Sequence, residues 1–167
     1  MRVMGIDPGG AVTGYGIVDG EPQGPLHCIV CGCVRTRSGS PFEQRLKLIY
    51  DEIAGVIGRH QPQQIVFEEI FISRNMRAAL QLGQARGAAL IAAVHADLPV
   101  FYYAAREVKL AVTGYGGAGK EQVQSMVSGL LQLNLADWPL DTSDALALAI
   151  CHHHRTASSF RLQGDRR

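Results

Sequence analysis

MRVMGIDPGGAVTGYGIVDG, the stretch Met1–Gly20, decides the fold class of this 167-residue chain. An apolar run ends in Asp7, the chain turns at Pro8–Gly10, and a β-favouring run over Thr13–Asp19 returns beside the first. Asp7 is therefore expected at the end of a buried strand. An ionised carboxylate is costly in apolar surroundings unless a partner compensates its charge. Asp7 either caps its own turn or binds a cation or a substrate group.

The composition predicts one globular domain at residues 1–155, followed by a basic, flexible tail at residues 156–167. Hydrophobic residues make up 47% of the chain and charged residues 19%, which excludes a disordered protein. The longest apolar run, Gly87–Val94, is too short to span a membrane. Four cysteines without a paired framework, and no visible signal peptide, predict free thiols and a cytoplasmic location.

Hydrophobic periodicity and turn residues predict strands and helices that alternate after an initial meander. A capping box over Ser40–Glu43, with Pro41 in the first helical position, is expected to open the first helix. The expected strands are Arg2–Asp7, Thr13–Asp19, Leu26–Thr36, Gln64–Glu68 and Pro99–Tyr103. The expected helices are one that ends before Pro62, Asn75–His95, Ala105–Val112, an amphipathic helix with Val123, Met126, Val127, Leu130 and Leu133 inward, and a last helix that begins near Asp141.

The strand Gln64–Glu68 ends in carboxylates, as the first strand does at Asp7. Because a helix crosses between these two strands, we expect them to pair in parallel and to end at the same edge of the sheet. Asp7 and Glu68 would then be neighbours. The last helix opens with Asp141 and Asp144 on one face of its first turn, and ordinary helix capping explains only one of them.

Four carboxylates without a histidine or thiol partner favour Mg²⁺ or Mn²⁺ and phosphate chemistry. Acids gathered at one sheet edge repel one another unless two metals lie between them, and two metals can clamp the attacking and leaving oxygens of a phosphodiester displacement. The net charge is only +1, but neutralising these four acids leaves 11 acidic residues against 16 Lys and Arg. The rest of the surface would then be basic and suited to a polyanion.

The helix expected over Asn75–His95 leaves two interpretations open. Its apolar and small residues share one side: Met76, Ala79, Leu80, Gly83, Gly87, Leu90, Ile91 and Val94. Because small residues let another backbone approach closely, this side either packs on the sheet or forms a symmetric contact between two subunits.

Several motifs stand in a characteristic order: Asp7-Pro8-Gly9 with Thr13-Gly14-Tyr15-Gly16, Phe67-Glu68-Glu69-Ile70-Phe71, Leu82-Gly83-Gln84-Ala85-Arg86-Gly87, and Asp141-Thr142-Ser143-Asp144-Ala145-Leu146-Ala147, with Arg45–Tyr50 and Pro99–Phe101 in support. Over roughly residues 1–155 they resemble the RuvC family of Holliday-junction resolvases. The resemblance implies an α/β, ribonuclease-H-like domain with a five-stranded mixed sheet flanked by helices. It further implies a homodimer, Mg²⁺-dependent nicking of two opposed strands of a four-way DNA junction, and a branch-migration helicase complex as a partner.

The resemblance also assigns residues to the site. The catalytic, metal-holding acids are Asp7, Glu68, Asp141 and Asp144, with two Mg²⁺ ions per site and Mn²⁺ as a substitute. Glu69 leaves an ambiguity, because a β-bulge would exchange it with Glu68. The residues assigned to DNA are Phe71, Arg74, Asn75, Arg77, Lys109 and Lys120. Phe71 either stacks on an unpaired base or belongs to the core.

Lys120 follows Gly114–Gly119, which nearly spells a nucleotide-binding P-loop. We reject that interpretation, because Glu121 stands where a Ser or Thr is needed and Arg106–Val112 has a helical pattern where a strand is needed. Lys120 either reaches DNA phosphate or is a solvated surface lysine.

Three other interpretations agree less well with the sequence. An actin-like ATPase has a similar first hairpin, but it needs a duplicated domain that this chain lacks. A non-catalytic junction-binding protein would not need all four carboxylates. A zinc site at Cys28, Cys31 and Cys33 with Cys151–His154 is disfavoured, because Cys28 is expected on the opposite side of its strand and consecutive histidines fan around a helix. Those histidines are expected to form a polar helix terminus.

Overall fold

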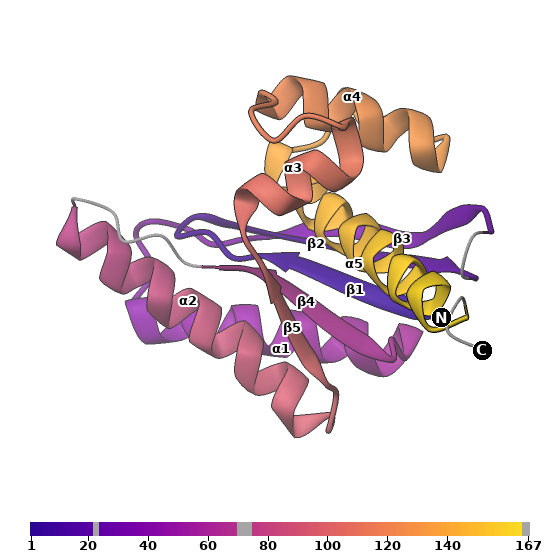
Figure 1. The fold of residues 1–167 in the computed structure, drawn as a ribbon. Coiled ribbons are helices and arrows are strands. Elements are labelled where there is room, and N and C mark those ends of the chain that lie inside the picture. Colours follow the sequence, from indigo (N-terminus) through magenta and orange to yellow (C-terminus); the bar gives the residue numbers. More distant parts are fainter. Residues whose placement is uncertain (22–23, 70–74, 165–167) are drawn as a thin grey trace.

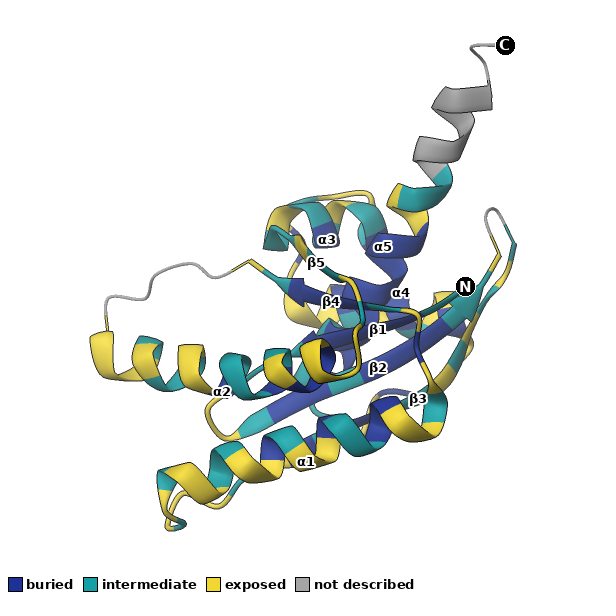
Figure 2. Cartoon of the chain, turned by 90° about the horizontal axis from the view of Figure 1, so that it is seen from below, coloured by how far each residue is buried: buried dark blue, intermediate teal, exposed yellow. Residues whose placement is uncertain are grey.

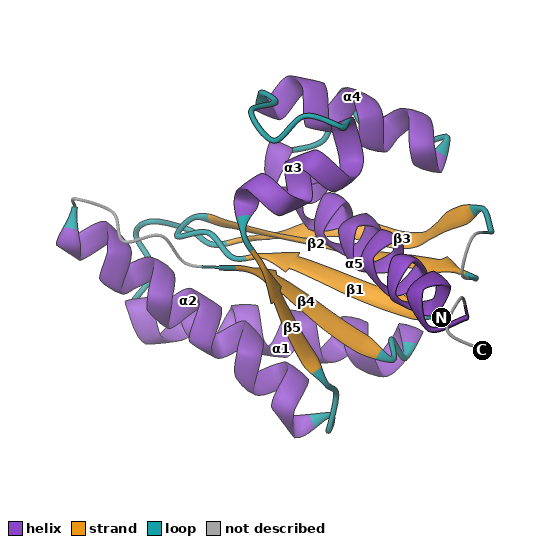
Figure 3. Ribbon diagram, in the orientation of Figure 1, coloured by secondary structure: helices purple, strands orange, loops and turns teal. Residues whose placement is uncertain are grey.

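The structure, a computed structural model, describes residues 1–21, 24–69 and 75–164, with side chains described to residue 157. Five strands form one mixed sheet in the order β3-β2-β1-β4-β5 (Figure 3). The strands are β1 (Arg2–Asp7), β2 (Val12–Gly20), β3 (Leu26–Arg35), β4 (Gln64–Glu68) and β5 (Val100–Tyr103). The helices are α1 (Phe42–His60), α2 (Met76–His95), α3 (Ala105–Thr113), α4 (Lys120–Leu131) and α5 (Leu140–Gly164). The predicted fold class is confirmed, and the predicted element bounds agree to within one or two residues except at the end of α5.

The sheet separates two hydrophobic cores (Figure 1). Helices α1 and α2 cover one face, around a core that includes Ile6 and Phe67. Helices α3, α4 and α5 cover the other face, around a core that includes Val3 and Leu146. Because neighbouring residues of a strand point to opposite faces, Asp7 and Glu68, which follow Ile6 and Phe67, are directed to the α5 side.

Helix α5 lies directly on β1 and β2 because glycines leave room for its backbone. A Cβ atom at Gly14 would lie 2.0 Å from the carbonyl oxygen of Asp141, and one at Gly5 would lie 1.9 Å from that of Ala145. Any larger residue at these two positions would push the start of α5 away from the sheet. The glycines of the first hairpin therefore set the height of the acidic first turn of α5 above the strands.

The packing of α2 tests the interpretation that its apolar side packs on the sheet. The residues that face the sheet are alanines: Ala85, Ala89, Ala92 and Ala93. Four large residues of the predicted apolar side, Met76, Leu80, Ile91 and Val94, are between 51% and 83% exposed. Figure 2 shows exposed residues along the outer side of α2. Most of that side therefore does not pack on the sheet, although Leu90 packs partly against the core, and its exposed residues are available for a contact with another molecule.

Two further expectations about helices were wrong. The N-cap of α1 is Pro41, and no side chain caps the helix, because Ser40 instead closes a turn through its backbone N–H to the carbonyl of Arg37. On α4, Val123 and Val127 are buried as predicted, but Met126 and Leu130 are exposed. The inward side of α4 is therefore narrower than its sequence pattern indicates.

Cys28 and Cys31 both pack against the core under α5, and this differs from the expectation that they face opposite ways. The register of β2 with β3 shifts between Ile17 and Val18, so that Ile29 forms an irregularity in β3. Such an extra residue reverses the alternation of side chains beyond it.

The histidines at 152–154 do not form a helix terminus, because the backbone of α5 remains helical to Gly164. His152 and His153 are buried, and each bonds different partners. His152 bonds Tyr103 Oη at 2.8 Å and Gln64 Oε1 at 2.6 Å, which ties α5 to β4 and β5.

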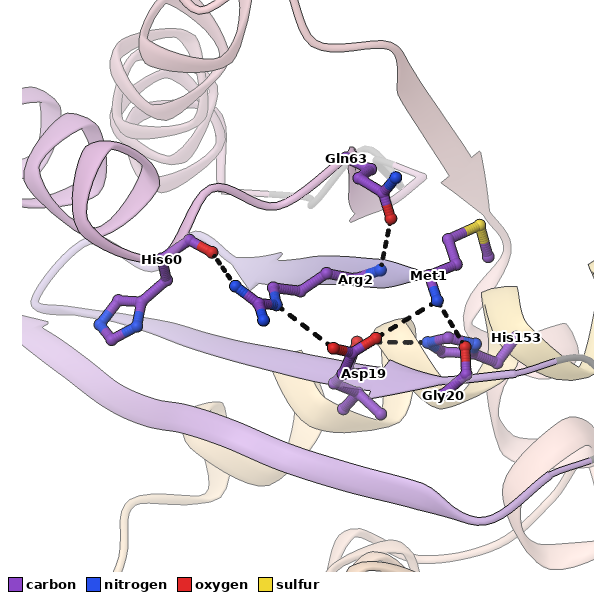
Figure 4. Close-up of polar contacts among 8 residues, drawn as sticks. Met1, Arg2, Asp19, Gly20, His60, Gln63 and His153 are labelled. Atoms are coloured by element: carbon purple, nitrogen blue, oxygen red, sulfur yellow. Dashed lines mark hydrogen bonds and ion pairs between the residues drawn. The ribbon is translucent and has the colours of Figure 1, made fainter.

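The end of the sheet far from Asp7 is closed by a polar cluster (Figure 4). The N-terminal ammonium donates to the carbonyl of Gly20 at 2.6 Å and pairs with Asp19 at 3.3 Å. Arg2 donates to Asp19 and to the carbonyl of His60. These contacts hold β1, β2 and the end of α1 together, so the cluster has a structural role. No helix of the described chain is both long enough and apolar enough to cross a membrane.

Candidate active site

Asp7 and Glu68 end two adjacent parallel strands, as the sequence predicts. The register pairs Met4 with Ile65 and Ile6 with Phe67, so the next residues, Asp7 and Glu68, lie side by side at the same sheet edge. Both carboxylates line a pocket of about 220 Å³. Glu69 is exposed and does not line this pocket, and its backbone N–H continues the sheet by donating to Tyr103. The geometry therefore favours Glu68 as the site residue.

The first turn of α5 supplies the other two acids. Asp144 lines the same pocket as Asp7 and Glu68. Asp141 lies one turn earlier and does not line the pocket, but its charge acts on Asp7, and its Oδ1 is 3.7 Å from the position of a Cβ atom at Gly9. The structure thus brings together acidic residues from three separate parts of the chain.

The electrostatics of the pocket disfavour negative charge on Asp7. Burial raises the pKa of Asp7 to about 7, and the charges of Asp144, Asp141 and Glu68 contribute to this rise. Burial, followed by the charge of Asp144, also raises the pKa of Glu68. Such mutual repulsion is typical of carboxylates that share a cation or a proton.

Lys120, the first residue of α4, places its ammonium among these acids. Its Nζ lies 2.8 Å from Oδ2 of Asp144. The hydrogen bond that Lys120 donates to Asp144 is the main cause that raises the pKa of Lys120, and the charges of Asp144, Asp7 and Asp141 add to it. Lys109, from α3, lines the pocket as well. Both predicted lysines therefore lie at the carboxylates.

These contacts indicate whether the residues of the pocket suit a divalent cation. Within residues 1–21, 24–69 and 75–164, no group of three or more His, Cys, Asp or Glu side chains could hold a metal ion as the side chains lie. The carboxylates are gathered, but they are not closed into a cage. The Lys120 ammonium nevertheless acts as a stand-in cation among hard oxygen donors, which are the donors that Mg²⁺ and Mn²⁺ prefer. The donor chemistry of the pocket therefore fits such an ion.

Arg86 is a residue near the site to which the sequence analysis gave no role. Its guanidinium Cζ lies 5.6 Å from the ring centre of Phe67 and 5.0 Å from that of Tyr102. Its charge, with those of Lys120 and Lys109, lowers the pKa of Glu68 against the effect of burial. The spacing of Arg86 on α2 carries no signal of this position, because the contact depends on how α2 lies against β4 and β5.

Side chains of Thr36 and Arg45, which follow β3, fix the turn after Asp7. Oγ1 of Thr36 lies 3.3 Å from the carbonyl oxygen of Gly10, and Arg45 donates to the same carbonyl. Arg45 also donates to Thr36 Oγ1 at 3.2 Å. The end of β3 and the start of α1 thereby hold the turn in place beside Asp7.

The residues assigned to DNA are only partly described. Phe71 and Arg74 lie outside the described residues. Asn75 is the N-cap of α2, where its Oδ1 accepts from the backbone N–H of Ala78 at 3.1 Å. Arg77 is exposed in the first turn of the same helix.

The family model described as "Crossover junction endodeoxyribonuclease RuvC" matches residues 3–152. This chain belongs to the RuvC family. A RuvC protein of Pelotomaculum thermopropionicum is 51% identical to it over 93% of this chain and 95% of the relative. A RuvC protein of Alkalilimnicola ehrlichii is 47% identical over 97% of this chain and 96% of the relative.

Solved structures agree with the family assignment. The structure titled "T. thermophilus RuvC in complex with Holliday junction substrate" matches with a TM-score of 0.85 and 34% identity, over 95% of this chain and 96% of that chain. The yeast mitochondrial Holliday junction resolvase Ydc2 matches with a TM-score of 0.65 over 95% of this chain and 82% of that chain. Because only 10% of the residues are identical, the Ydc2 match shows a shared fold and no more.

Proposed function

We propose that this chain is a divalent-metal-dependent endonuclease that resolves Holliday junctions by nicking two opposed strands. The observation that carries the proposal is the pocket at which Asp7, Glu68 and Asp144 meet two lysines. Membership of the RuvC family supplies the class of substrate. A non-catalytic junction-binding protein would not need these costly, mutually repelling acids.

Asp7, Glu68, Asp141 and Asp144 are the residues that would hold the metal, with two Mg²⁺ ions per site and Mn²⁺ as a substitute. When bound, the metal would activate water for attack on phosphorus and neutralise charge on the leaving 3′ oxygen. The protein positions the reaction: the strand ends fix Asp7 and Glu68, and the first turn of α5 fixes the two aspartates. The products would carry 5′-phosphate and 3′-hydroxyl ends.

The cations beside the acids support binding of a polyanionic backbone. Lys109 and Lys120 face the pocket from α3 and α4. We propose that both contact phosphates near the cut. The loop Gly114–Gly119 joins two helices, which excludes the P-loop arrangement of a strand followed by a helix. No observation favours the ATPase alternative.

A homodimer is the second part of the proposal. The exposed residues of α2, with Gly83 and Gly87 between them, recur at intervals of three and four residues along one stripe: Met76, Leu80, Gly83, Gly87, Ile91 and Val94. A stripe of large residues around small ones suits a symmetric helix pair. Two subunits would place two pockets on one junction, and this would allow paired cuts. From the family we also infer a branch-migration helicase complex as a partner and a cytoplasmic location.

The chemistry of the ends tests the proposal. A synthetic immobile four-way junction is incubated with the protein and Mg²⁺, and the nicked products are treated with DNA ligase. Direct resealing is expected, because 5′-phosphate and 3′-hydroxyl ends need no repair. Nicks that ligase seals only after phosphorylation would contradict the proposed hydrolysis.

A further inference from the structure

Lys120 occupies the place in the pocket where a positive charge is most favoured. Its Nζ lies 2.8 Å from Asp144, and Asp7 and Glu68 line the same pocket. An ammonium surrounded by carboxylates neutralises part of the negative charge that a divalent ion would neutralise. The ammonium and the ion therefore require the same oxygen atoms.

The side chain of Lys120 can leave the pocket without unfolding of the protein. Its side chain is 57% exposed, whereas that of Asp144 is 20% exposed, so the lysine reaches inward from the solvent side. Lys120 is the first residue of α4 and follows the glycine-rich segment Gly114–Gly119. The backbone at this point is held independently of the ion pair, because the N–H of Gly119 donates to Gln122 Oε1 at 2.8 Å. Rotation of the lysine side chain alone can break the contact.

We propose that Lys120 is an internal counter-cation whose ion pair with Asp144 is mutually exclusive with divalent-ion binding, and which is transferred to a DNA phosphate when the ion binds. The inference rests on the proposed nuclease function. It adds that metal and DNA assist each other: a phosphate that draws Lys120 away frees Asp144 for the ion. By thermodynamic linkage, the ion must strengthen the lysine–phosphate contact by the same factor.

Lys109 provides a matched control, because it lines the same pocket and carries the same charge. Unlike Lys120, it has no carboxylate of another described residue within 4.0 Å of its ammonium. Neutralising either lysine removes one positive charge near the acids. Only neutralising Lys120 also removes a competitor for Asp144.

The test measures Mn²⁺ affinity by calorimetry, without DNA, for the wild type, Lys120→Met, Lys120→Arg and Lys109→Met. Lys120→Met is expected to bind Mn²⁺ about tenfold more tightly than the wild type. Lys120→Arg is expected to bind like the wild type, and Lys109→Met is expected to gain less than about threefold. Equal or weaker binding by Lys120→Met would overturn the proposal, as would an equal gain in both methionine variants. Lys120→Gln replaces Lys120→Met if circular dichroism shows that the methionine variant is misfolded.

A second measurement addresses the linkage. Addition of a four-way junction is expected to raise the Mn²⁺ affinity of the wild type several-fold more than that of Lys120→Met, because the variant has no lysine to displace. An equal rise in both proteins would contradict the transfer of Lys120. Junction cleavage by the wild type is assayed separately. Tighter Mn²⁺ binding by Lys120→Met without wild-type cleavage would refute the nuclease proposal alone, and cleavage with unchanged Mn²⁺ affinity would refute the counter-cation alone.

Discussion

Asp7 lies at the inner end of the acidic pocket, where burial and three neighbouring carboxylates raise its pKa to about 7. Its place at a strand end could be predicted from the sequence, because an apolar run stops at a carboxylate before a glycine turn. The pairing of Lys120 with Asp144 could not, since it joins two helices whose relative position depends on the whole core beneath α5. The position of Arg86 could not be predicted for a similar reason, since it depends on how α2 packs against β4 and β5.

Replacing Asp7 is expected to raise the stability of the protein and to abolish its activity. Since the folded-state pKa of about 7 is above the 3.8 of an unperturbed aspartate, the free energy of unfolding falls as pH rises from about 4 to about 7. In divalent-free buffer at pH 8, Asp7→Asn should raise the free energy of unfolding by up to about 4 kcal/mol. It should also abolish cleavage. Urea unfolding and a junction nicking assay check the two effects.

Glu69→Gln is the control for Asp7→Asn, because Glu69 is exposed one residue beyond the pocket. We expect it to keep both wild-type stability and cleavage, whereas Glu68→Gln should lose cleavage. If Glu69→Gln were the inactive variant of this pair, the assignment of Glu68 to the site would be wrong.

Because of His152, the free energy of unfolding is expected to fall in mildly acidic buffer. Burial, with a smaller effect of His153, lowers its pKa to about 4, below the usual 6.5. The neutral ring is therefore favoured in the folded state, and its contribution to stability is lost as pH falls from 6.5 to 4. The wild type should lose about 3 kcal/mol through this group, and His152→Asn should not. Urea unfolding at several pH values checks this, and parallel pH profiles of the two proteins would contradict it.

At the scale of elements, the contact of α5 with the first hairpin sets the geometry of the acids. The meander, the crossover and the parallel pairing of β1 with β4 follow from sequence pattern, because each depends on local periodicity and connection length. Two details escaped the pattern. The irregularity at Ile29 moved Cys28 to the other face, and most large residues on the apolar side of α2 are exposed. A hydrophobic sequence pattern identifies the apolar side of a helix or strand, but not the surface that packs against it.

Gly14→Ala tests the contact of α5. The new Cβ would lie 2.0 Å from the carbonyl oxygen of Asp141, so α5 must shift outward. We expect a loss of about 1–3 kcal/mol in the free energy of unfolding and a large loss of cleavage. Gly10→Ala is the matched control, because nothing lies within 4 Å of its Cβ position. Equal stability of the two variants would show that α5 does not depend on this close approach.

At the scale of the whole molecule, the two faces of the sheet have different tasks. The acidic pocket lies on the side covered by α3, α4 and α5, and the exposed stripe lies on the other side of the sheet, on the outer surface of α2. One subunit has one pocket of this kind among the described residues, so the proposed paired cuts would use the pockets of two subunits.

Ile91→Glu should break the proposed dimer, because it places a charge in the middle of the apolar stripe. Sedimentation velocity should show a monomer, and coordinated cleavage should give way to slow single nicks. Ile29→Glu, at an exposed position on the edge strand β3, should remain dimeric. A dimer that survived Ile91→Glu would move the interface away from α2.

The most direct test of the central claim, that these acids form a divalent-dependent nuclease site for four-way DNA, is one cleavage experiment. The purified protein is incubated with a synthetic immobile junction and with the matching linear duplex, each in Mg²⁺ and in EDTA. The account predicts paired, symmetric nicks in the junction with Mg²⁺ and no nicks in the other three reactions. A junction that is bound but remains uncut in Mg²⁺, or one that is cut equally in EDTA, would contradict it.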